Sequence, residues 1–416
     1  MRGLIEKQNI PSGWQEKKLG DICDIVNGST PKRSVLEYWD NGDIPWFTVD
    51  DIRSNGRIVS KTTQSITDKA LKDTSIKLLP KNSVLLCCTA SLGEVALTKI
   101  QLTTNQQFNG LVSKDAQSLL PYYLFYSAQK FGEKLKSKSG KTTINFLSVG
   151  SLSKEKVLIP PIKEQQKIAE ILGTMDEDIA KTQGVIEVTE KLKRGLMQEL
   201  FTRGVGHTKF KETELGEIPA EWEAVKLGDI GTNYIGLTYS PKNVTDATGA
   251  LVLRSSNVQD GYISYMDNVY VDSNIPEHLI AKKGDILLCT RNGSRNLIGK
   301  CAFIDENSAG HSFGAFMSVY RTKHSDFIFQ VFLSDIFKNQ INKFLGATIN
   351  QITNSSLNSF VVPLPPAEEQ KEIVKILSAV DEKILVNKKL KEKLTLLKKG
   401  LMQDLLSGKV RILSST

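Results

Sequence analysis

The sequence predicts an α+β fold in which two globular domains of mixed helix and strand, related by a pseudo-two-fold axis, are joined by two long antiparallel helices that form a coiled coil. Three observations support this prediction. Motifs of the first half of the chain return in the second half, and each half contains a long proline-free segment with heptad spacing. The remainder of each half consists of short apolar runs separated by turn residues, which is typical of strands.

The composition is that of a globular protein with a mild excess of positive charge. The 416 residues include 54 Lys and Arg against 46 Asp and Glu, a net charge of +8, and 40% hydrophobic residues. This balance excludes a disordered or collagen-like chain. The longest apolar run, at 84–88, is far shorter than the roughly 20 residues of a membrane helix. The N-terminus has no apolar signal core, so we expect a cytoplasmic protein without membrane association.

Cysteine and histidine usage predicts neither disulfides nor a metal site. The five cysteines form no C-x-x-C pair and lie mostly in apolar runs, which favours buried free thiols. The four histidines lack the spacing of zinc ligands. The residues are Cys23, Cys87, Cys88, Cys289, Cys301, His207, His278, His311 and His324.

Two motifs carry the internal repeat. Ile10-Pro11-x-x-Trp14, followed by Leu19-Gly20-Asp21-Ile22, returns 208 residues later as Ile218-Pro219-x-x-Trp222 with the same Leu-Gly-Asp-Ile. Pro160-Pro161-x-x-Glu164-Gln165 returns 205 residues later, and 16 of the 39 positions from 163 to 201 are identical to those 205 residues on. The intervening segments 31–142 and 239–347 share little, so we expect two domains of one origin with different surfaces.

Each repeated segment is predicted to be one long helix. Apolar residues or Thr recur in steps of mostly four and three, which is the seam of packed helices. Both copies take two consecutive steps of three, around Thr182 and Asn387, which predicts a local overwinding of the supercoil called a stammer. The predicted seam comprises Ile168, Leu172, Met175, Ile179, Thr182, Val185, Thr189, Leu192, Leu196 and Leu200, and Ile373, Leu377, Val380, Ile384, Asn387, Leu390, Leu394, Leu397, Leu401 and Leu405.

Chain order constrains how these helices pair. The second globular domain lies between them, so the second helix starts near the end of the first and must run antiparallel to pack along it. Helices of roughly 40 residues are about 60 Å long, enough to hold two domains one turn of a DNA duplex apart, about 34–36 Å. The predicted parts are a first recognition domain at 1–160, a helix at 161–204, a second domain at 205–362, a helix at 363–408 and a tail at 409–416.

Basic and amide side chains on predicted loops are the candidates for DNA contact. One stretch rich in Ser and Gly holds five lysines and a single acid, Glu133, which predicts a loop that contacts phosphates. The lysines are Lys130, Lys134, Lys136, Lys138 and Lys141. In the second domain, Arg291, Asn292 and Arg295 follow a predicted strand and could read guanine and adenine edges. Further candidates are Lys32, Arg33, Arg254 and Asn257.

The search for catalytic motifs finds no phosphate-binding loop and no nucleophile elbow. No Asn or Asp precedes Pro160-Pro161 or Pro365-Pro366, so the tetrapeptide of amino-methyltransferases is absent. The neighbourhoods of Gln165 and Gln370 fit the first turns of helices, with Pro at the start and acids near the positive end of the helix dipole. We expect a chain without a catalytic or metal site.

The layout resembles the specificity subunits of type I restriction-modification systems, and the resemblance covers essentially the whole chain. It rests on the two Ile-Pro-x-x-Trp motifs, the Pro-Pro-x-x-Glu-Gln helix starts and Gly-Leu-Met-Gln near each helix end. It also rests on Gly28-Ser29-Thr30-Pro31, on Tyr38-Trp39-x3-Asp43-Ile44-Pro45-Trp46-Phe47 and on Thr104-Asn105-Gln106-Gln107-Phe108. The second domain departs from this pattern, since Gly236-Leu237-Thr238-Tyr239-Ser240-Pro241 carries an insertion before Pro.

The resemblance implies a DNA-binding protein without catalytic activity of its own. Each of the two domains would read one half of a split, asymmetric site in double-stranded DNA. The helices would set the spacing of the halves and dock two methyltransferase subunits, which restriction subunits can join. S-adenosylmethionine would bind in the methyltransferase, where adenine is methylated, and this chain would hold no cofactor.

Three alternatives remain open on the sequence. The chain could serve a modification-only system, it could be a coiled-coil adaptor that binds only proteins, or one domain could conceal an endonuclease. The absence of a convincing acid constellation weighs against the endonuclease.

Overall fold

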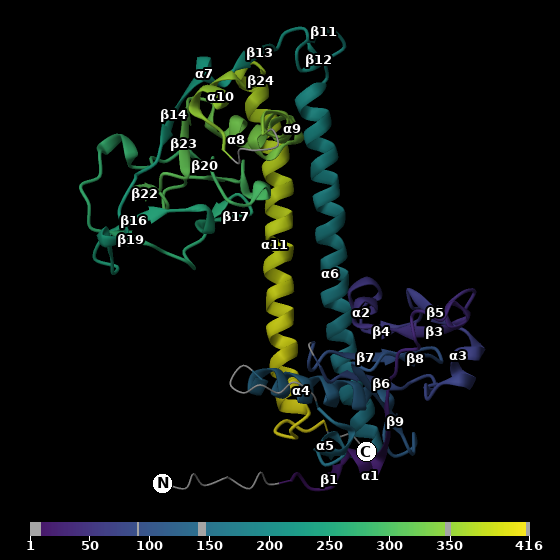
Figure 1. Cartoon of the computed structure of the whole chain (residues 1–416). Helices are drawn as coiled ribbons and strands as arrows, with labels where there is room; N and C mark the ends of the chain where they lie inside the picture. The colour runs from purple at the N-terminus through teal and green to yellow at the C-terminus, as the bar shows by residue number, and fades with distance from the viewer. Residues whose placement is uncertain (1–9, 90, 140–146, 346–350, 413–416) are drawn as a thin grey trace. The chain divides into compact units, whose positions relative to one another are not determined.

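The computed structural model describes residues 10–89, 91–139, 147–345 and 351–412, with only the backbone described at 137–139. The chain divides into two compact units, Met1–Gln183 with Lys389–Thr416 and Gly184–Lys388. Each unit holds one globular domain and one part of each of the two long helices, because both unit boundaries fall within these helices (Figure 1). None of the helices in the described ranges is long and apolar enough to cross a membrane.

The first globular domain is built on a five-stranded sheet of order β2-β9-β6-β7-β4, beside a three-stranded sheet β5-β3-β8 and a ribbon β1-β10. Its strands are β1 (Gln15–Lys18), β2 (Cys23–Asn27), β3 (Ile44–Phe47), β4 (Ile58–Val59), β5 (Gln64–Ile66), β6 (Val84–Cys87), β7 (Val95–Thr98), β8 (Thr103–Thr104), β9 (Phe108–Ser113) and β10 (Lys156–Ile159). Its helices are α1 (Leu19–Ile22), η1 (Leu36–Tyr38), α2 (Val49–Asn55), α3 (Asp68–Asp73), α4 (Pro121–Ser139) and α5 (Val149–Leu152).

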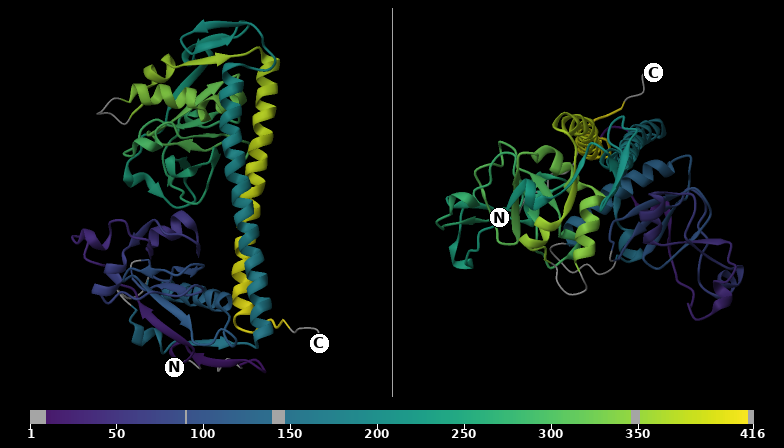
Figure 2. Two further views of the ribbon diagram at one scale, coloured as in Figure 1. Left: turned by 90° about the vertical axis from the view of Figure 1, so that its right-hand side faces the viewer. Right: turned by 90° about the horizontal axis from the view of Figure 1, so that it is seen from above.

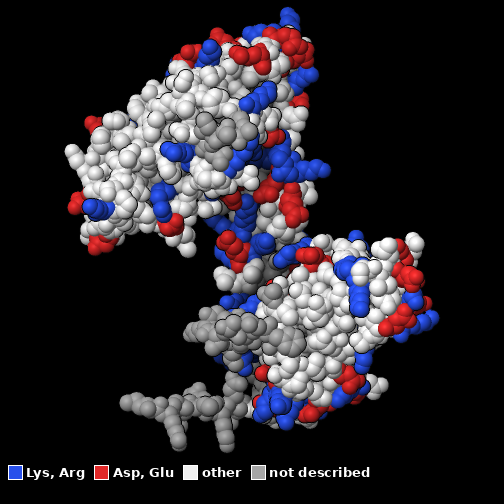
Figure 3. Space-filling view, viewed as in Figure 1, with Lys and Arg blue, Asp and Glu red and all other residues white. Residues whose placement is uncertain are grey.

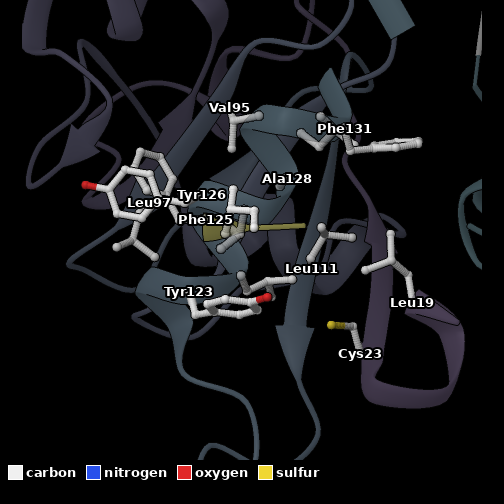
Figure 4. Close-up of a cluster of buried hydrophobic side chains, with 14 of the residues drawn as sticks. Leu19, Cys23, Val95, Leu97, Leu111, Tyr123, Phe125, Tyr126, Ala128 and Phe131 are labelled. Atoms are coloured by element: carbon white, nitrogen blue, oxygen red, sulfur yellow. The ribbon is translucent and has the colours of Figure 1, made fainter. Parts of the chain in front are cut away.

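Helix α4 covers one face of the five-stranded sheet and forms the main core of this domain. Its buried residues Leu124, Ala128, Phe131 and Leu135 recur in steps of four and three, so one stripe of the helix faces the sheet. Figure 4 shows aromatic side chains of α4 gathered with Val95, Leu97 and Leu111 from the strands and Leu19 from α1. The prediction of a lysine-rich loop is therefore wrong for Lys130 to Lys138, because this periodic apolar stripe continues the helix to Ser139.

The second globular domain repeats this plan with different additions. Its central sheet has the order β14-β23-β20-β21, beside a second sheet β15-β19-β16-β22 and the ribbons β13-β24, β11-β12 and β17-β18. Its strands are β11 (Phe210–Thr213), β12 (Gly216–Pro219), β13 (Glu223–Lys226), β14 (Gly231–Ile235), β15 (Val244–Thr245), β16 (Ala250–Leu253), β17 (Val258–Gln259), β18 (Tyr262–Ile263), β19 (Tyr270–Val271), β20 (Ile286–Cys289), β21 (Cys301–Phe303), β22 (Ser312–Phe313), β23 (Met317–Thr322) and β24 (Val361–Leu364). Its helices are α7 (Leu227–Ile230), η2 (Pro241–Asn243), η3 (Ser255–Asn257), η4 (Glu277–Leu279), η5 (Arg295–Leu297), α8 (Ser325–Leu333), α9 (Asp335–Phe344) and α10 (Asn354–Ser359).

The two domains share one scaffold although their sequences differ. Strands β2, β9, β6 and β7 occupy the same sheet order as β14, β23, β20 and β21. In each domain one short parallel pair lies beside this sheet, β3 with β8 and β16 with β22. The pairs align Phe47 with Thr104 and Leu253 with Phe313. Residue 48 in the first domain therefore corresponds to residue 254 in the second.

Helices α6 (Ile162–Thr202) and α11 (Ala367–Leu405) are the two long repeated segments, and they lie side by side within each unit (Figure 2). In the first unit, Ile168 and Leu172 of α6 share a core with Met402 and Leu405 of α11. In the second unit, Met197 and Leu200 share a core with Ile373 and Leu377. The start of each helix thus packs against the end of the other, which confirms the antiparallel pairing.

The predicted stammer is wrong, because the buried seam continues in regular steps beyond Thr182. Ile186 is buried, whereas Val185 is 41% and Leu192 55% exposed. The next seam position after Thr189 is Lys193, whose ammonium lies 2.7 Å from Asp381. In the other unit the repeat-equivalent Lys398 lies 2.5 Å from Asp176. Two lysines therefore hold seam positions that hydrophobicity alone assigned to their leucine neighbours.

The repeated Glu-Gln pair in the first turn of each long helix is structural. Glu164 accepts the indole N–H of Trp14 at 2.9 Å, and Glu369 accepts that of Trp222 at 2.7 Å. Gln165 donates to the carbonyl of Pro160 at 2.9 Å, and Gln370 donates to Pro365 at 2.7 Å. The two repeated motifs of the sequence are thus the two sides of one contact, made once in each unit.

Candidate nucleic-acid interface

The same three chain segments converge beside the central sheet of each domain. The loop after β2 meets the turn between β8 and β9 so closely that a Cβ on Gly28 would lie 2.1 Å from the carbonyl oxygen of Asn105. The loop after β14 meets the turn between β22 and β23 equally closely, and a Cβ on Gly236 would lie 2.2 Å from that of Gly314. The residue that follows β3 or β16 is the third contributor. Glycine at these positions allows two backbones to touch and brings the polar loops together.

In the first domain, aromatic rings hold the basic loop that follows β2. The Arg33 guanidinium lies 3.7 Å from the ring centre of Trp39 and 4.8 Å from that of Trp46, which is a cation–π arrangement. The indole N–H groups of Trp39 and Trp46 donate to the carbonyls of Lys32 and Ser29, each at 3.2 Å. Lys32 and Arg33 are both exposed. The loop therefore presents two cations on a fixed backbone.

A polar contact completes this site from the neighbouring turn. The Thr30 hydroxyl donates to the amide oxygen of Gln106, which leaves the amide nitrogen of Gln106 as a donor. Gln106 belongs to the Asn-Gln-Gln-Phe segment between β8 and β9. A fixed amide beside two cations is suited to base edges and phosphates at the same time.

The lysines of α4 have a different setting from the one predicted. Lys136 lies 2.6 Å from Glu94, and Arg57 lies 3.1 Å from the other oxygen of the same carboxylate. Burial opposes ionisation of Glu94, but its bonds to Lys136 and Arg57 outweigh burial and hold the pKa of the carboxyl below its usual value. Lys138 lies on the helix with its side chain undescribed, and Lys141 lies outside the described residues. Lys136 therefore bridges the helix to the sheet.

In the second domain, Arg254 and Asn257 have opposite roles. Arg254 is the residue that follows β16, and it forms an ion pair with Asp267 at 2.9 Å. Asn257 is fully buried: its oxygen accepts the Arg254 backbone N–H at 2.9 Å, and its amide donates to the carbonyl of Ser264 at 2.9 Å. The prediction of base contact is wrong for Asn257, because its amide is already engaged inside the protein. Asn257 positions Arg254 instead.

The loop after β20 also divides between surface and structure. Arg291 is exposed and lies 5.1 Å from the ring centre of Phe316, and Asn292 donates to the Ser255 hydroxyl at 3.2 Å. Arg295 donates to the carbonyls of Leu345 at 2.8 Å and Asn342 at 3.4 Å, at the end of α9. A cation at this end of a helix stabilises it, so Arg295 anchors α9 even though it is exposed.

Sequence reasoning missed the aromatic and acidic members of both sites. Trp39 and Trp46 carry Arg33, Phe316 carries Arg291, and Asp267 pairs with Arg254. An aromatic residue within a short distance of an arginine was a usable signal in the first domain. No local pattern connects Phe316 with Arg291 or Asp267 with Arg254, because the fold brings these pairs together.

Charge alone does not mark an interface on the face of the protein that Figure 3 shows. On the face in view in Figure 3, Lys and Arg side chains are scattered among uncharged and acidic residues over each globular domain. Figure 3 therefore gives no reason to expect binding by a dense phosphate clamp on this face. The candidate interfaces are therefore defined by the loops that converge in each domain.

The long helices carry a second kind of surface, an apolar patch that occurs once in each unit. Val185 and Leu192 on α6 are 41% and 55% exposed, and their repeat equivalents Leu390 and Leu397 on α11 are 44% and 54% exposed. Residues seven apart lie on the same face of a helix. We call these pairs the helix patches.

A family model described as the type I restriction modification DNA specificity domain matches this chain twice, over residues 11–190 and 219–396. The chain belongs to this family. The MjaVIII specificity subunit of Methanocaldococcus jannaschii is 30% identical over 424 residues, covering 99% of this chain and 95% of the relative. The putative MjaX specificity subunit of the same organism is 31% identical, covering 97% of this chain and 95% of the relative.

Two solved structures share the fold of this specificity-family chain. The S subunit of a type I restriction-modification system from M. genitalium has a TM-score of 0.56 at 16% identity, covering 97% of this chain and 98% of that one. A second structure is described as showing the structural basis of complex assembly and conformational transition of the type I R-M system. Its chain has a TM-score of 0.61 at 16% identity, covering 97% of this chain and 100% of that one. At this identity the likeness concerns the fold alone.

Proposed function

We propose that this chain supplies the DNA sequence specificity of a type I restriction-modification complex. Each globular domain reads one half of a bipartite, asymmetric site in duplex DNA, and α6 and α11 set the distance between the halves. The observation that carries the proposal is one scaffold built twice with unlike residues on the same converging loops. A duplicated scaffold presents two readers, and unlike loops give the two halves different sequences.

The difference between the loops is clearest at the residue after the parallel strand. In the first domain this residue is Thr48, whose backbone N–H donates to Asp51 at 2.8 Å in a buried capping box. In the second domain it is Arg254, whose long side chain extends from a loop held in the same way by Asn257. The scaffold is thus maintained while the presented side chain changes, as expected for two readers of different sequence.

The helix patches support docking of methyltransferase subunits, one on each patch. Because the patches are equivalent by the repeat, a partner that fits one fits the other, and two copies of one subunit would bind. Exposed apolar side chains at matching positions are typical of a protein interface. Restriction subunits would join this assembly through the bound partners.

The chemistry would lie in the partners, and this chain would need no cofactor. Methylation from S-adenosylmethionine would occur in the methyltransferase. Burial raises the pKa of the Cys23 thiol to about 12 and that of Cys88 to about 11, so these thiols stay protonated and are poor nucleophiles. A pure preparation of the chain that nicked DNA with a divalent metal would revive the endonuclease alternative.

The proposal is tested by selecting DNA with the chain assembled with its methyltransferase. Random duplexes recovered at near-physiological salt should converge on one bipartite sequence, bound at least about 1,000-fold more tightly than scrambled DNA. Replacing residues 10–160 by the first domain of a relative should change one half-site and leave the other unchanged. Equal affinity for selected and scrambled duplexes would refute DNA reading and favour the protein-only adaptor.

A further inference from the structure

A pocket of about 600 Å³ opens between the converging loops of the second domain. Its lining residues include those that follow the parallel strands β16 and β22, and both strands are labelled in Figure 1. Its walls combine the aromatic side chains of Tyr239 and Phe316 with the polar groups of Arg254, Ser256 and Asp267. Phe316 is 56% exposed, so the pocket has an apolar wall open to a ligand.

Two polar atoms of this pocket are buried without a partner. Among the residues that the structure describes, neither Nε of Arg254 nor Oγ of Ser256 has a hydrogen-bond partner. A buried polar group without a partner costs free energy, so such atoms often mark a place that a ligand completes. Here the arginine offers a donor and the serine either a donor or an acceptor.

The charges in the pocket select between kinds of ligand. Arg254 Nη2 lies 2.9 Å from Asp267, whose side chain is 62% exposed and therefore remains accessible beside the arginine. A carboxylate next to the arginine repels phosphate, which disfavours the DNA backbone. A G·C base pair presents guanine acceptors beside a cytosine amino donor in the major groove. An arginine next to an aspartate offers the complementary donor and acceptor.

We propose that Arg254 and Asp267 together read one G·C base pair in the half-site bound by the second domain, a proposal that rests on the proposed function. Arg254 donates to guanine O6 and N7, and Asp267 accepts from cytosine N4. An A·T pair would instead direct the adenine amino group at the arginine and the acceptor O4 of thymine at the aspartate, and both contacts are unfavourable. Asn257 holds the backbone of Arg254 in place for this reading.

The first domain has no counterpart of this pair at the equivalent position. Thr48 occupies the place of Arg254, and Asp51 accepts the N–H groups of Thr48 and Thr63 at 2.8 and 2.7 Å inside the fold. The Arg254–Asp267 pair therefore requires a G·C base pair only in the half-site that the second domain binds.

The test measures sequence preference base pair by base pair, with the full chain assembled with its methyltransferase. The affinity for the selected site is compared with the affinities for a set of duplexes, each of which carries one base-pair change. The set covers every position of both half-sites. In the Arg254→Gln variant, discrimination at one G·C position of one half-site should fall roughly 10- to 100-fold, the effect of one bidentate base contact. The Asp267→Asn variant should weaken discrimination at the same position, and all other positions should keep theirs.

The matched control is Lys283→Gln, which removes an exposed ion pair with Glu306 in the same unit, and neither residue lines the pocket. It should leave the preference at every position unchanged. If the Arg254→Gln variant unfolds at a lower temperature than the unmodified chain, the Asp267→Asn variant alone is used for the test. The exposed side chain of Asp267 tolerates replacement.

Each result decides the proposal. An unchanged preference profile in both variants, or an equal loss of affinity for every duplex, overturns the reading by this pair and leaves DNA recognition intact. A selected half-site without any G·C position also overturns it. If the unmodified complex shows no sequence preference at all, the proposed function itself fails.

Discussion

At the residue scale, the repeated tryptophan and glutamate form a clamp that closes each unit. Glu164 binds Trp14 and is held by Arg411, which follows α11, with two bonds of 2.9 and 3.0 Å. In the other unit Glu369 accepts the indole N–H of Trp222. The Nε2 of His207, which follows α6, lies 2.8 Å from the same carboxylate. In both cases the segment after one long helix returns to the first turn of the other.

The clamp in the first unit should contribute to stability in a pH-dependent way. Burial opposes ionisation of Glu164, but the bonds from Arg411 and Trp14 outweigh it and hold the pKa of its carboxyl below the ordinary value of 4.5. A depressed pKa in the folded state means that the ionised clamp stabilises the fold above about pH 4.5. This contribution is lost as the pH falls through the lowered pKa.

We therefore expect Arg411→Gln to lower the free energy of unfolding by about 1–3 kcal/mol near neutral pH, because a buried carboxylate loses its charged partner. The difference from the unmodified chain should shrink in acid, where Glu164 is protonated in both. Urea unfolding followed by circular dichroism, from about pH 7 to about pH 3, measures this. The control Arg53→Gln breaks an exposed pair with Asp50 and should change stability by less than about 1 kcal/mol. An Arg411 effect that stays constant in acid would contradict the assignment.

The residues of the candidate sites were predictable only in part. Lys32, Arg33, Arg254 and Arg291 could be selected because each is a cation next to a predicted strand or turn. Asn257 lies only three residues after Arg254 in the sequence, yet it is buried, because burial depends on whether a loop folds over the side chain. Contacts between residues far apart in the chain decide which polar side chains remain available.

At the element scale, the position of the long helices followed from their repeat, but their faces did not. The seam was correct up to Thr182 because apolar residues hold every seam position before it. Beyond it, Lys193 and Lys398 occupy the seam, and their aliphatic stems pack while their ammonium groups reach Asp381 and Asp176. Val185 and the three leucines displaced from the seam form the helix patches, so the error in the predicted seam also explains why this exposed surface was not predicted.

The helix patches should each bind one methyltransferase subunit. Leu192→Glu places a charge in one patch, and we expect the purified complex to lose one of two methyltransferase copies. Leu397→Glu should remove the other copy, and the double variant should remove both. Sedimentation or native mass measurements of the reconstituted complex give the stoichiometry. Charge cannot be buried in an apolar interface without a large cost.

The control for this experiment is Ala180→Glu, which adds the same charge at an exposed position on a different face of α6. It should leave two copies bound. If the patch variants also keep both copies, the methyltransferases dock elsewhere, while DNA reading by the two domains is unaffected.

At the scale of the whole molecule, duplication explains why one chain can recognise an asymmetric sequence. A homodimer presents identical readers and is matched to a palindrome. Here the scaffold is repeated, including the sheet order and the clamp, while the loops have diverged. The internal repeat predicted this organisation directly, because it was visible in the motifs. The shared sheet was not visible in the sequence, since the same backbone topology accepts very different side chains.

The length of the helices should set the gap between the two half-sites. Duplicating residues 182–188 in α6 and 387–393 in α11 adds one heptad to each helix, which preserves the seam and lengthens both by about 10 Å. At 3.4 Å per base pair, the preferred gap should grow by about three base pairs. Methylation of a duplex series with gaps of increasing length measures the preference.

The same insertion should also weaken binding, and the reason lies in the two helical periods. Three base pairs turn the duplex by about 100°, since a turn takes 10–10.5 base pairs, whereas a heptad turns an α-helix face by only about 20°. The two domains would therefore reach the correct distance at an unfavourable rotation, and the DNA must untwist to meet them. Inserting the heptad in α6 alone is the control and should prevent assembly, because the seam loses register. A preferred gap that stays the same in the double insertion would show that the helices do not measure it.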